Sequence, residues 1–237
     1  MPDIDLGTVA GGSRTLHGYL VEPDRAGPWP GVVMLHEAFG LNDMMRRQAD
    51  RLASAGYLTL APDLFSDGGA RRCLVSTFRA MFAGQGKAVE DIEAARTHLL
   101  GLTACTGKVG VIGFCMGGGF ALVVANRGFD AAAPNYGTVP RRPTEALRGA
   151  CPMVASYGAK DITMRGAATK LERTLTELDI PHDVKEYPSA GHSFLNDEFF
   201  GPTLTHRVQR IAHLGPDPAA APDAWSRIEE FFAEHLG

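Results

Sequence analysis

Short apolar runs alternate along this chain with longer segments in which apolar residues recur at helical spacing. Residues 31–35 form a continuous apolar run, which is typical of a strand covered on both faces. Residues 87–102 place Val89, Ile92 and Ala95 on one face of a predicted helix. The same criteria predict further strands at 57–64, 109–112, 129–136, 152–157 and 182–187, and further helices at 42–55, 167–178 and 224–236. Strands that alternate with helices in this way predict an α/β fold with a mostly parallel sheet and helices on both faces.

Several segments are less regular than this alternation. Residues 8–22 are expected to form an antiparallel hairpin that turns at Gly11 and Gly12. Residues 66–86 predict a loop with a short helix over one end of the sheet. The C-terminal helix is expected to bury Phe231 with the other apolar residues of its inner face.

The stretch from residue 109 to 119 reads V-G-V-I-G-F-C-M-G-G-G and joins a predicted strand to a small, apolar helical segment. It matches the G-x-S-x-G turn that presents a nucleophile, with Cys115 in place of serine. Gly113 and Gly117 lack the Cβ atoms that would clash where strand and helix cross closely. Such a turn places the cysteine at a helix N-terminus, where the helix dipole favours a thiolate. The alternative is a buried structural cysteine in a glycine-rich connection.

Reactive side chains follow four of the predicted strands: Glu37, Cys115, Asp161 and His192. In open α/β sheets, sites form at the carboxyl ends of the strands. The chain order nucleophile, acid, histidine is that of the α/β-hydrolases. Taken singly, Asp161 could be a helix cap, His192 a packing histidine and Glu37 a solvated loop carboxylate. Together and in this order, they predict a catalytic triad with one additional carboxylate.

The residue types of this triad suit nucleophilic catalysis. Cys115 needs a neighbouring base, because the thiolate is the attacking species. His192 would take the thiol proton and later return a proton to the leaving group, while Asp161 would hold the imidazole in the required tautomer. The backbone N–H groups of Met116 and Ala38 would form the oxyanion hole.

Five short motifs give the sequence a resemblance to the dienelactone hydrolase family (carboxymethylenebutenolidase-like proteins) of the α/β-hydrolase fold. The motifs are H-E-A-F-G at 36–40, A-P-D-L at 61–64, G-F-C-M-G-G at 113–118, G-A-K-D at 158–161 and A-G-H-S-F at 190–194. The likeness covers the whole chain, so it implies one domain over residues 1–237. It also implies a triad of Cys115, His192 and Asp161. Glu37 resembles the family's extra carboxylate, which couples substrate arrival to thiolate formation because a carboxylate near a thiol opposes its ionisation.

The positions expected to contact substrate depart from the family's pattern. Family members that cleave dienelactone carry an arginine soon after G-H-S-F, and this chain has Asn196 there. Arg71 or Arg72 could supply a second family arginine, with a solvated pair on a loop as the alternative. Phe39 and Tyr136 are candidate pocket walls or, alternatively, ordinary core residues. The prediction is therefore hydrolysis of a small ester or lactone, with dienelactone itself left open.

Composition argues against several other functions. A chain of 237 residues suits one large α/β domain, and a net charge of −4 argues against nucleic-acid binding. No apolar run has membrane-spanning length, and the acidic N-terminus lacks the apolar core of a signal peptide. The four cysteines form no C-x-x-C pair, and no H-E-x-x-H spacing indicates a metal. We therefore expect a cytoplasmic monomer or small homo-oligomer that needs no cofactor or metal, acts on a small molecule, and has neither a nucleic-acid nor a membrane partner.

A second class of function stays open at this point. A non-hydrolytic, redox-responsive or ligand-binding protein could use the same fold, since fold does not determine function and an accessible, acidic thiol is also an oxidation site. Acylation and turnover at Cys115 would distinguish the hydrolase from this alternative.

Overall fold

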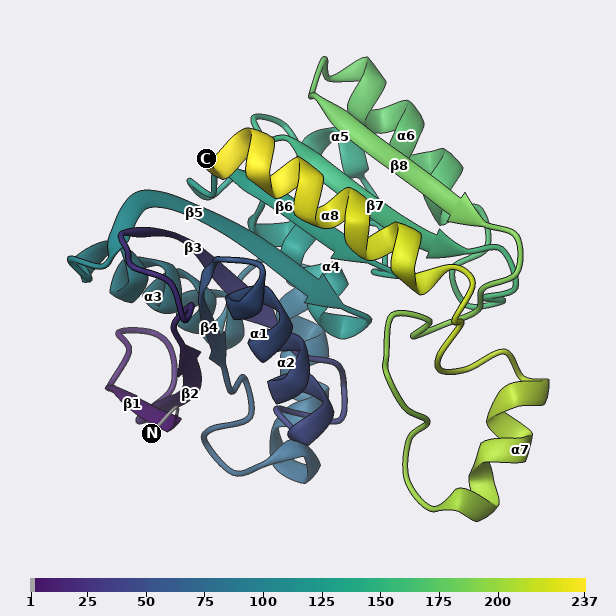
Figure 1. Ribbon diagram of the computed structural model, residues 1–237, viewed down its shortest axis with the longest axis horizontal. Coiled ribbons are helices and arrows are strands. Elements are labelled where there is room, and N and C mark those ends of the chain that lie inside the picture. The colour runs from purple at the N-terminus through teal and green to yellow at the C-terminus, as the bar shows by residue number, and fades with distance from the viewer. Residues whose placement is uncertain (1–2) are drawn as a thin grey trace.

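The computed structural model describes residues 3–237, which contain one eight-stranded sheet (Figure 1). The strands are β1 (Asp3–Gly7), β2 (Leu16–Val21), β3 (Trp29–Leu35), β4 (Leu58–Pro62), β5 (Cys105–Phe114), β6 (Ala131–Asn135), β7 (Met153–Gly158) and β8 (His182–Tyr187). Their order across the sheet is β1-β2-β4-β3-β5-β6-β7-β8. The pairs β1–β2 and β2–β4 are antiparallel, and every pair from β4 onward is parallel.

Helices cover both faces of this sheet. They are α1 (Asp43–Ser54), α2 (Ala70–Ala83), α3 (Lys87–Gly101), α4 (Met116–Val124), α5 (Pro143–Ala146), α6 (Ala167–Glu177), α7 (Thr203–Ile211) and α8 (Ala221–Leu236). Figure 1 shows α1 and α8 in front of the sheet, with α3, α4 and α6 behind it. Helix α2 packs on α3 and α4, and α5 packs on α6. The predicted α/β architecture is confirmed.

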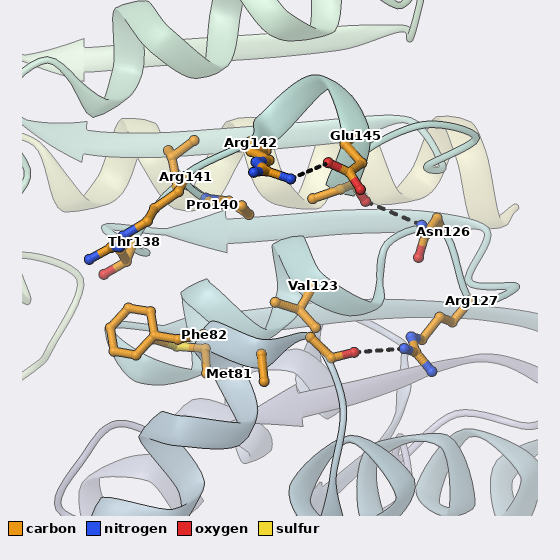
Figure 2. Close-up of a pocket in the computed structure, with 14 residues that line it drawn as sticks. Met81, Phe82, Val123, Asn126, Arg127, Thr138, Pro140, Arg141, Arg142 and Glu145 are labelled. Atoms are coloured by element: carbon orange, nitrogen blue, oxygen red, sulfur yellow. Dashed lines mark hydrogen bonds and ion pairs between the residues drawn. The ribbon is translucent and has the colours of Figure 1, made fainter.

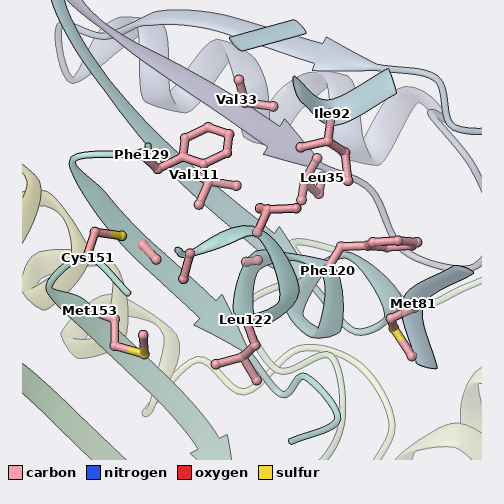
Figure 3. Packing of buried hydrophobic residues seen from close by; sticks show 14 of the residues in the cluster. Val33, Leu35, Met81, Ile92, Val111, Phe120, Leu122, Phe129, Cys151 and Met153 are labelled. Atoms are coloured by element: carbon pink, nitrogen blue, oxygen red, sulfur yellow. The ribbon is translucent and has the colours of Figure 1, made fainter. Parts of the chain in front are cut away.

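The alternation of side chains along the central strands explains their continuous apolar runs. Val33 and Leu35 of β3 point into one hydrophobic cluster, whereas Val32 and Met34 point into the other, so both faces of the strand are buried. Figure 3 shows the cluster behind the sheet, where Phe120 of α4 lies among side chains from β3, β5 and α3. The first turns of α4 are therefore packed directly on the central strands.

Three predictions about the connections were wrong in detail. The first arm of the hairpin is β1, which lies in the acidic stretch before residue 8. The connection between the two arms is held by a helix outside the hairpin, because the N–H and Oγ of Ser13 both bind Asp91 of α3 at 2.7 Å. Helix α2 has 14 residues instead of being short, since it buries Met81 against its neighbouring helices. Phe231 is only half-buried, because Phe232 takes the inner position.

Four neighbouring parallel strands end side by side. Leu35 pairs with Gly113, Phe114 pairs with Asn135, and Asn135 pairs with Ser156. The segments that follow β3, β5, β6 and β7 therefore meet at one edge of the sheet, where sites of α/β proteins form. Residues 3–237 contain no helix that is long and apolar enough to cross a membrane.

Candidate active site

The turn between β5 and α4 has the strand–turn–helix geometry expected of this stretch. Cys115 has a φ of 54°, a left-handed conformation that is rare for a residue with a side chain. A Cβ atom on Gly113 would overlap the carbonyl of Gly117, and one on Gly117 would overlap the carbonyl of Leu35. Only glycine fits at these two positions, so the tight crossing that presents Cys115 depends on both.

Asp161 and His192 meet at the carboxyl ends of β7 and β8. His192 Nδ1 lies 2.5 Å from Asp161 Oδ2. The other carboxylate oxygen, Oδ1, accepts hydrogen bonds from Thr163 N–H at 2.9 Å and Thr163 Oγ1 at 2.6 Å. Because a carboxylate can only accept, Nδ1 carries the proton. Nε2 is left for Cys115, the other hydrogen-bond partner of His192.

The charges of this pair reinforce each other. Burial disfavours the imidazolium of His192, but hydrogen bonds with Asp161 and Cys115 outweigh burial and raise the pKa of His192 to about 10. Burial also disfavours the Asp161 carboxylate, but its hydrogen bonds from His192 and Thr163 outweigh this effect and lower its pKa. The folded protein thus stabilises the imidazolium that His192 forms when Nε2 accepts a proton beside Cys115.

Glu37 lies fully buried behind this pair in a set of hydrogen bonds. Its Oε1 accepts from Ser193 Oγ at 2.9 Å, and its two oxygens lie 3.4 and 3.3 Å from Asn196 Nδ2. Burial raises the pKa of Glu37, and the bonds from Ser193 and Asn196, with the charge of His192, offset burial only in part. No positive side chain pairs with Glu37 among residues 3–237, other than His192 nearby.

Two backbone N–H groups at the edge of the sheet are free to bind a ligand. In the part of the chain that the structure describes, neither Ala38 N–H nor Met116 N–H donates a hydrogen bond to a protein acceptor. Ala38 follows β3 and Met116 begins α4, on the two strands that pair through Leu35 and Gly113. Unpaired donors at a helix start and at a neighbouring strand end suit a developing oxyanion.

Comparison with known proteins shows to which family the chain belongs. The model of the dienelactone hydrolase family matches residues 16–236. The chain belongs to the dienelactone hydrolase family. A carboxymethylenebutenolidase from Rhodococcus opacus is 30% identical over 92% of this chain and 86% of that protein. A carboxymethylenebutenolidase from Pseudomonas putida is 29% identical over 75% of this chain and 80% of its own length.

Solved structures agree with this assignment. A dienelactone hydrolase-like promiscuous phosphotriesterase from metagenomic libraries superimposes with a TM-score of 0.79 at 27% identity, over 99% of this chain and 98% of that chain. The α/β-hydrolase fold that the motifs implied is thereby confirmed for this family member.

Tyr136 packs directly on the residues that surround the proposed base. Its ring lies 5.2 Å from the ring of His192 and 5.6 Å from that of Phe194, measured between centroids, and its side chain is fully buried. Burial, followed by the negative charges of Glu37 and Cys115, raises the pKa of Tyr136 well above its usual value. The hydroxyl of Tyr136 lacks a hydrogen bond of regular geometry within residues 3–237. Tyr136 therefore packs against His192 from the buried side of the site.

The remaining expected substrate contacts lie farther out. Phe39 is 62% exposed and packs on Phe200, with 4.5 Å between ring centroids, so it is not a core residue. Arg71 is exposed on the first turn of α2, and among the described residues it forms no ion pair. Asn196 is buried against Glu37, so its side chain faces the carboxylate of Glu37 instead of offering itself to a substrate. The roles of Phe39 and Arg71 stay predictions.

A groove of about 1080 Å³ lies behind the sheet, between the end of α2 and residues 138–146 (Figure 2). Met81 and Phe82 form one wall, and Thr138 and Pro140 stand opposite them. Cys115, Asp161 and His192 do not line this groove.

Among residues 3–237, no cluster of three or more histidine, cysteine or acidic side chains is arranged to hold a metal ion.

Sequence reasoning missed residues that bind Asp161 and His192. Thr163 could have been found, because an aspartate whose side chain binds the N–H two residues later is a recurrent local motif. His213 carries no such signal: it accepts the N–H of His192 at 3.0 Å, and Gly215 N–H returns to the carbonyl of His192 at 2.9 Å. The segment that follows α7 therefore returns to the backbone of His192 and holds it through two hydrogen bonds.

Proposed function

We propose that this protein hydrolyses small esters or lactones through a covalent acyl-enzyme on Cys115. The observation that carries this proposal is the Asp161–His192 pair, which faces a cysteine held at a strained turn on a helix N-terminus. The relatives named carboxymethylenebutenolidase, a lactone hydrolase, support the same substrate class. Thiol, imidazole and carboxylate then have the order and the hydrogen bonds of a nucleophile, its base and the residue that orients the base.

In the first half of the reaction, His192 Nε2 takes the proton of the Cys115 thiol and the sulfur attacks the carbonyl carbon of the substrate. The N–H groups of Ala38 and Met116 bind the oxyanion of the tetrahedral intermediate. As that intermediate collapses, the C–O bond breaks and the departing oxygen receives the proton from His192. With a lactone, the new hydroxyl stays attached to the acyl chain.

In the second half, water attacks the thioester while His192 accepts one of its protons. Collapse of the second tetrahedral intermediate breaks the C–S bond, releases the carboxylic acid and returns the proton to sulfur. Asp161 keeps Nδ1 of His192 protonated throughout and stabilises the imidazolium in both halves. The protein therefore ends the cycle in the state in which it began.

Glu37 and the outer residues set the charge and shape of the site. We propose that Glu37 influences the ionisation of the Cys115 thiol. Its buried negative charge interacts with His192 and opposes a second negative charge nearby. Asn196 is uncharged and its amide binds Glu37, so it offers a substrate carboxylate no cation, and this favours a neutral ester or lactone. Phe39 and Arg71 are the proposed outer substrate contacts.

Intact-protein mass spectrometry tests the nucleophile. Wild type would be incubated with p-nitrophenyl acetate, a dienelactone and a saturated lactone, beside Cys115→Ala and Cys105→Ala. Cys105 is a matched control, because it begins the same strand that leads to Cys115 but lies at the opposite end of that strand. We expect a transient acyl adduct and product release in wild type and Cys105→Ala, and neither in Cys115→Ala.

Full esterase activity in Cys115→Ala would refute the proposal. A wild type that forms no adduct with any of these substrates, but whose Cys115 is oxidised by peroxide, would favour the redox-responsive alternative. The identity of the substrate that gives the fastest turnover would separate dienelactone from simpler lactones.

A further inference from the structure

His36 is a buried histidine that the proposed chemistry does not use. It follows β3 directly, its side chain is fully buried, and its ring meets that of Phe65 edge-on with 4.9 Å between centroids. Its two ring nitrogens each contact backbone: Nδ1 lies 2.7 Å from the carbonyl oxygen of Glu37, and Nε2 lies 3.0 Å from the N–H of Leu64. The imidazole thus joins the segments that follow β3 and β4.

These two contacts define the protonation of the ring. A backbone carbonyl can only accept, so Nδ1 carries a proton that it donates to Glu37. A backbone N–H can only donate, so Nε2 is unprotonated and accepts from Leu64. Asp63 Oδ1 is 3.6 Å from Nε2, beyond hydrogen-bond distance. His36 is therefore a neutral imidazole of the Nδ1–H tautomer.

The hydrogen bond to Glu37 also fixes the next peptide group. The carbonyl of Glu37 accepts a second hydrogen bond, from Gly40 N–H at 3.0 Å, so two donors hold it in one direction. In a planar trans peptide the C=O and the following N–H point in opposite directions. The orientation of the Ala38 N–H is therefore set by the contact that His36 makes with the carbonyl of Glu37.

The start of α4 lies against this same segment. A Cβ on Gly117 would collide with the carbonyls of Leu35 and His36, which shows how closely the turn after Cys115 approaches the end of β3. The start of α4 therefore approaches the chain within two residues of the peptide that His36 orients. A rotation of the Glu37–Ala38 peptide would turn a carbonyl oxygen toward the place where the oxyanion forms, which is repulsive where stabilisation is needed.

We propose that His36 is a positioning residue for the oxyanion hole: as a neutral donor to the Glu37 carbonyl, it holds the Ala38 N–H toward the reacting carbonyl oxygen. This inference rests on the proposed function, since it assigns a cause to one half of that oxyanion hole. His36 itself touches neither substrate nor the reacting atoms.

Two substitutions separate the two hydrogen bonds of the ring. In His36→Asn, the side-chain N–H₂ occupies the position of Nδ1 and keeps the donor to Glu37, but Leu64 loses its acceptor. In His36→Gln, the longer amide reaches the position of Nε2 and keeps the acceptor for Leu64, but the donor to Glu37 is lost. Each variant loses one buried hydrogen bond, so we expect similar falls in Tm.

The rate of acylation should distinguish the variants where stability does not. We expect the single-turnover acylation rate with p-nitrophenyl acetate to be about 10- to 100-fold lower in His36→Gln than in His36→Asn. Loss of one oxyanion donor lowers the rate by about 10²–10³, and the Glu37–Ala38 peptide will keep its orientation in some of the variant molecules. Most of the loss should fall on kcat, with KM little changed, because the oxyanion exists only after attack.

Equal acylation rates in the two variants would refute this inference alone, whereas a wild type that forms no acyl adduct would refute the proposed function and this inference with it. Nitrogen-15 NMR of the wild-type protein gives a second test that depends on no variant. We expect a protonated Nδ1 and an unprotonated Nε2 for His36 at neutral pH. A protonated Nε2 would overturn the assignment.

Discussion

Replacing Asp161 by asparagine should force the proposed base into the wrong tautomer. Both donors of Thr163, its N–H and its Oγ1–H, bind Asp161 Oδ1. In Asp161→Asn the amide oxygen must take that position, because an amide N–H₂ there would face two donors. The N–H₂ group then faces Nδ1 of His192, which must accept, and the ring proton moves to Nε2 on the side of Cys115.

The expected loss is large. The pKa of His192 is raised from 6.5 to about 10 against the opposing effect of burial, and Asp161 is the first contributor to that increase. Converted at 1.36 kcal/mol per pKa unit, the whole shift corresponds to about 5 kcal/mol of preference for the charged ring. The same substitution in a Ser-His-Asp triad lowers kcat by about 10⁴, which is again about 5 kcal/mol. We expect an acylation rate about 10⁴-fold below that of wild type.

The assay is single-turnover acylation with p-nitrophenyl acetate, together with an NMR titration of His192. In Asp161→Asn the pKa of His192 should fall from about 10 to its ordinary value or below, because the hydrogen bond and the charge of Asp161, which oppose the effect of burial, are then lost. Thr163→Val is the matched control: it removes one donor to Asp161 but leaves the carboxylate and the N–H of residue 163, so we expect less than about a tenfold loss.

Two results would contradict this reasoning. An Asp161→Asn variant within about tenfold of wild type would show that the carboxylate does not set the tautomer of the base. A His192 pKa that is unchanged in the variant would show that the 2.5 Å contact does not govern its protonation.

Two further predictions concern stability. Burial raises the pKa of Glu37, so the free energy of unfolding of the wild type falls as the pH rises from about 4.5 through the pKa of the folded state. Glu37→Gln should abolish this fall, so its stability relative to wild type should increase between pH 4 and pH 8 in urea unfolding. Its amide can also donate to the unpaired Oδ1 of Asn196. An unaltered pH slope would show that Glu37 stays charged at no cost. Phe120→Ala should cost about 3–5 kcal/mol because the ring is fully buried, whereas Phe82→Ala, at 68% exposure, should change stability by about 0.5 kcal/mol or less. Equal losses in these two variants would contradict the packing in Figure 3.

The sequence by itself determined how the parallel strands alternate with the main helices along the chain, and the turn at Cys115. Both are encoded locally: the apolar runs of β3 and β5 read as strands buried on two faces, and the spacing of Gly113 and Gly117 has a steric meaning that needs no other part of the chain. The strand ends that carry Glu37, Asp161 and His192 could also be placed, because parallel topology brings carboxyl ends to one edge.

Only the tertiary structure decided what each polar side chain does there. Asn196 is four residues from His192 in sequence, yet it binds Glu37, which follows β3, and no local pattern predicts that contact. The backbone of His192 is held by His213, which lies just after α7. His36 reads as an ordinary strand-end residue until its two backbone partners are seen. These contacts depend on the paths of loops whose sequences have no periodicity, so their geometry emerges only when the packed sheet brings distant segments together.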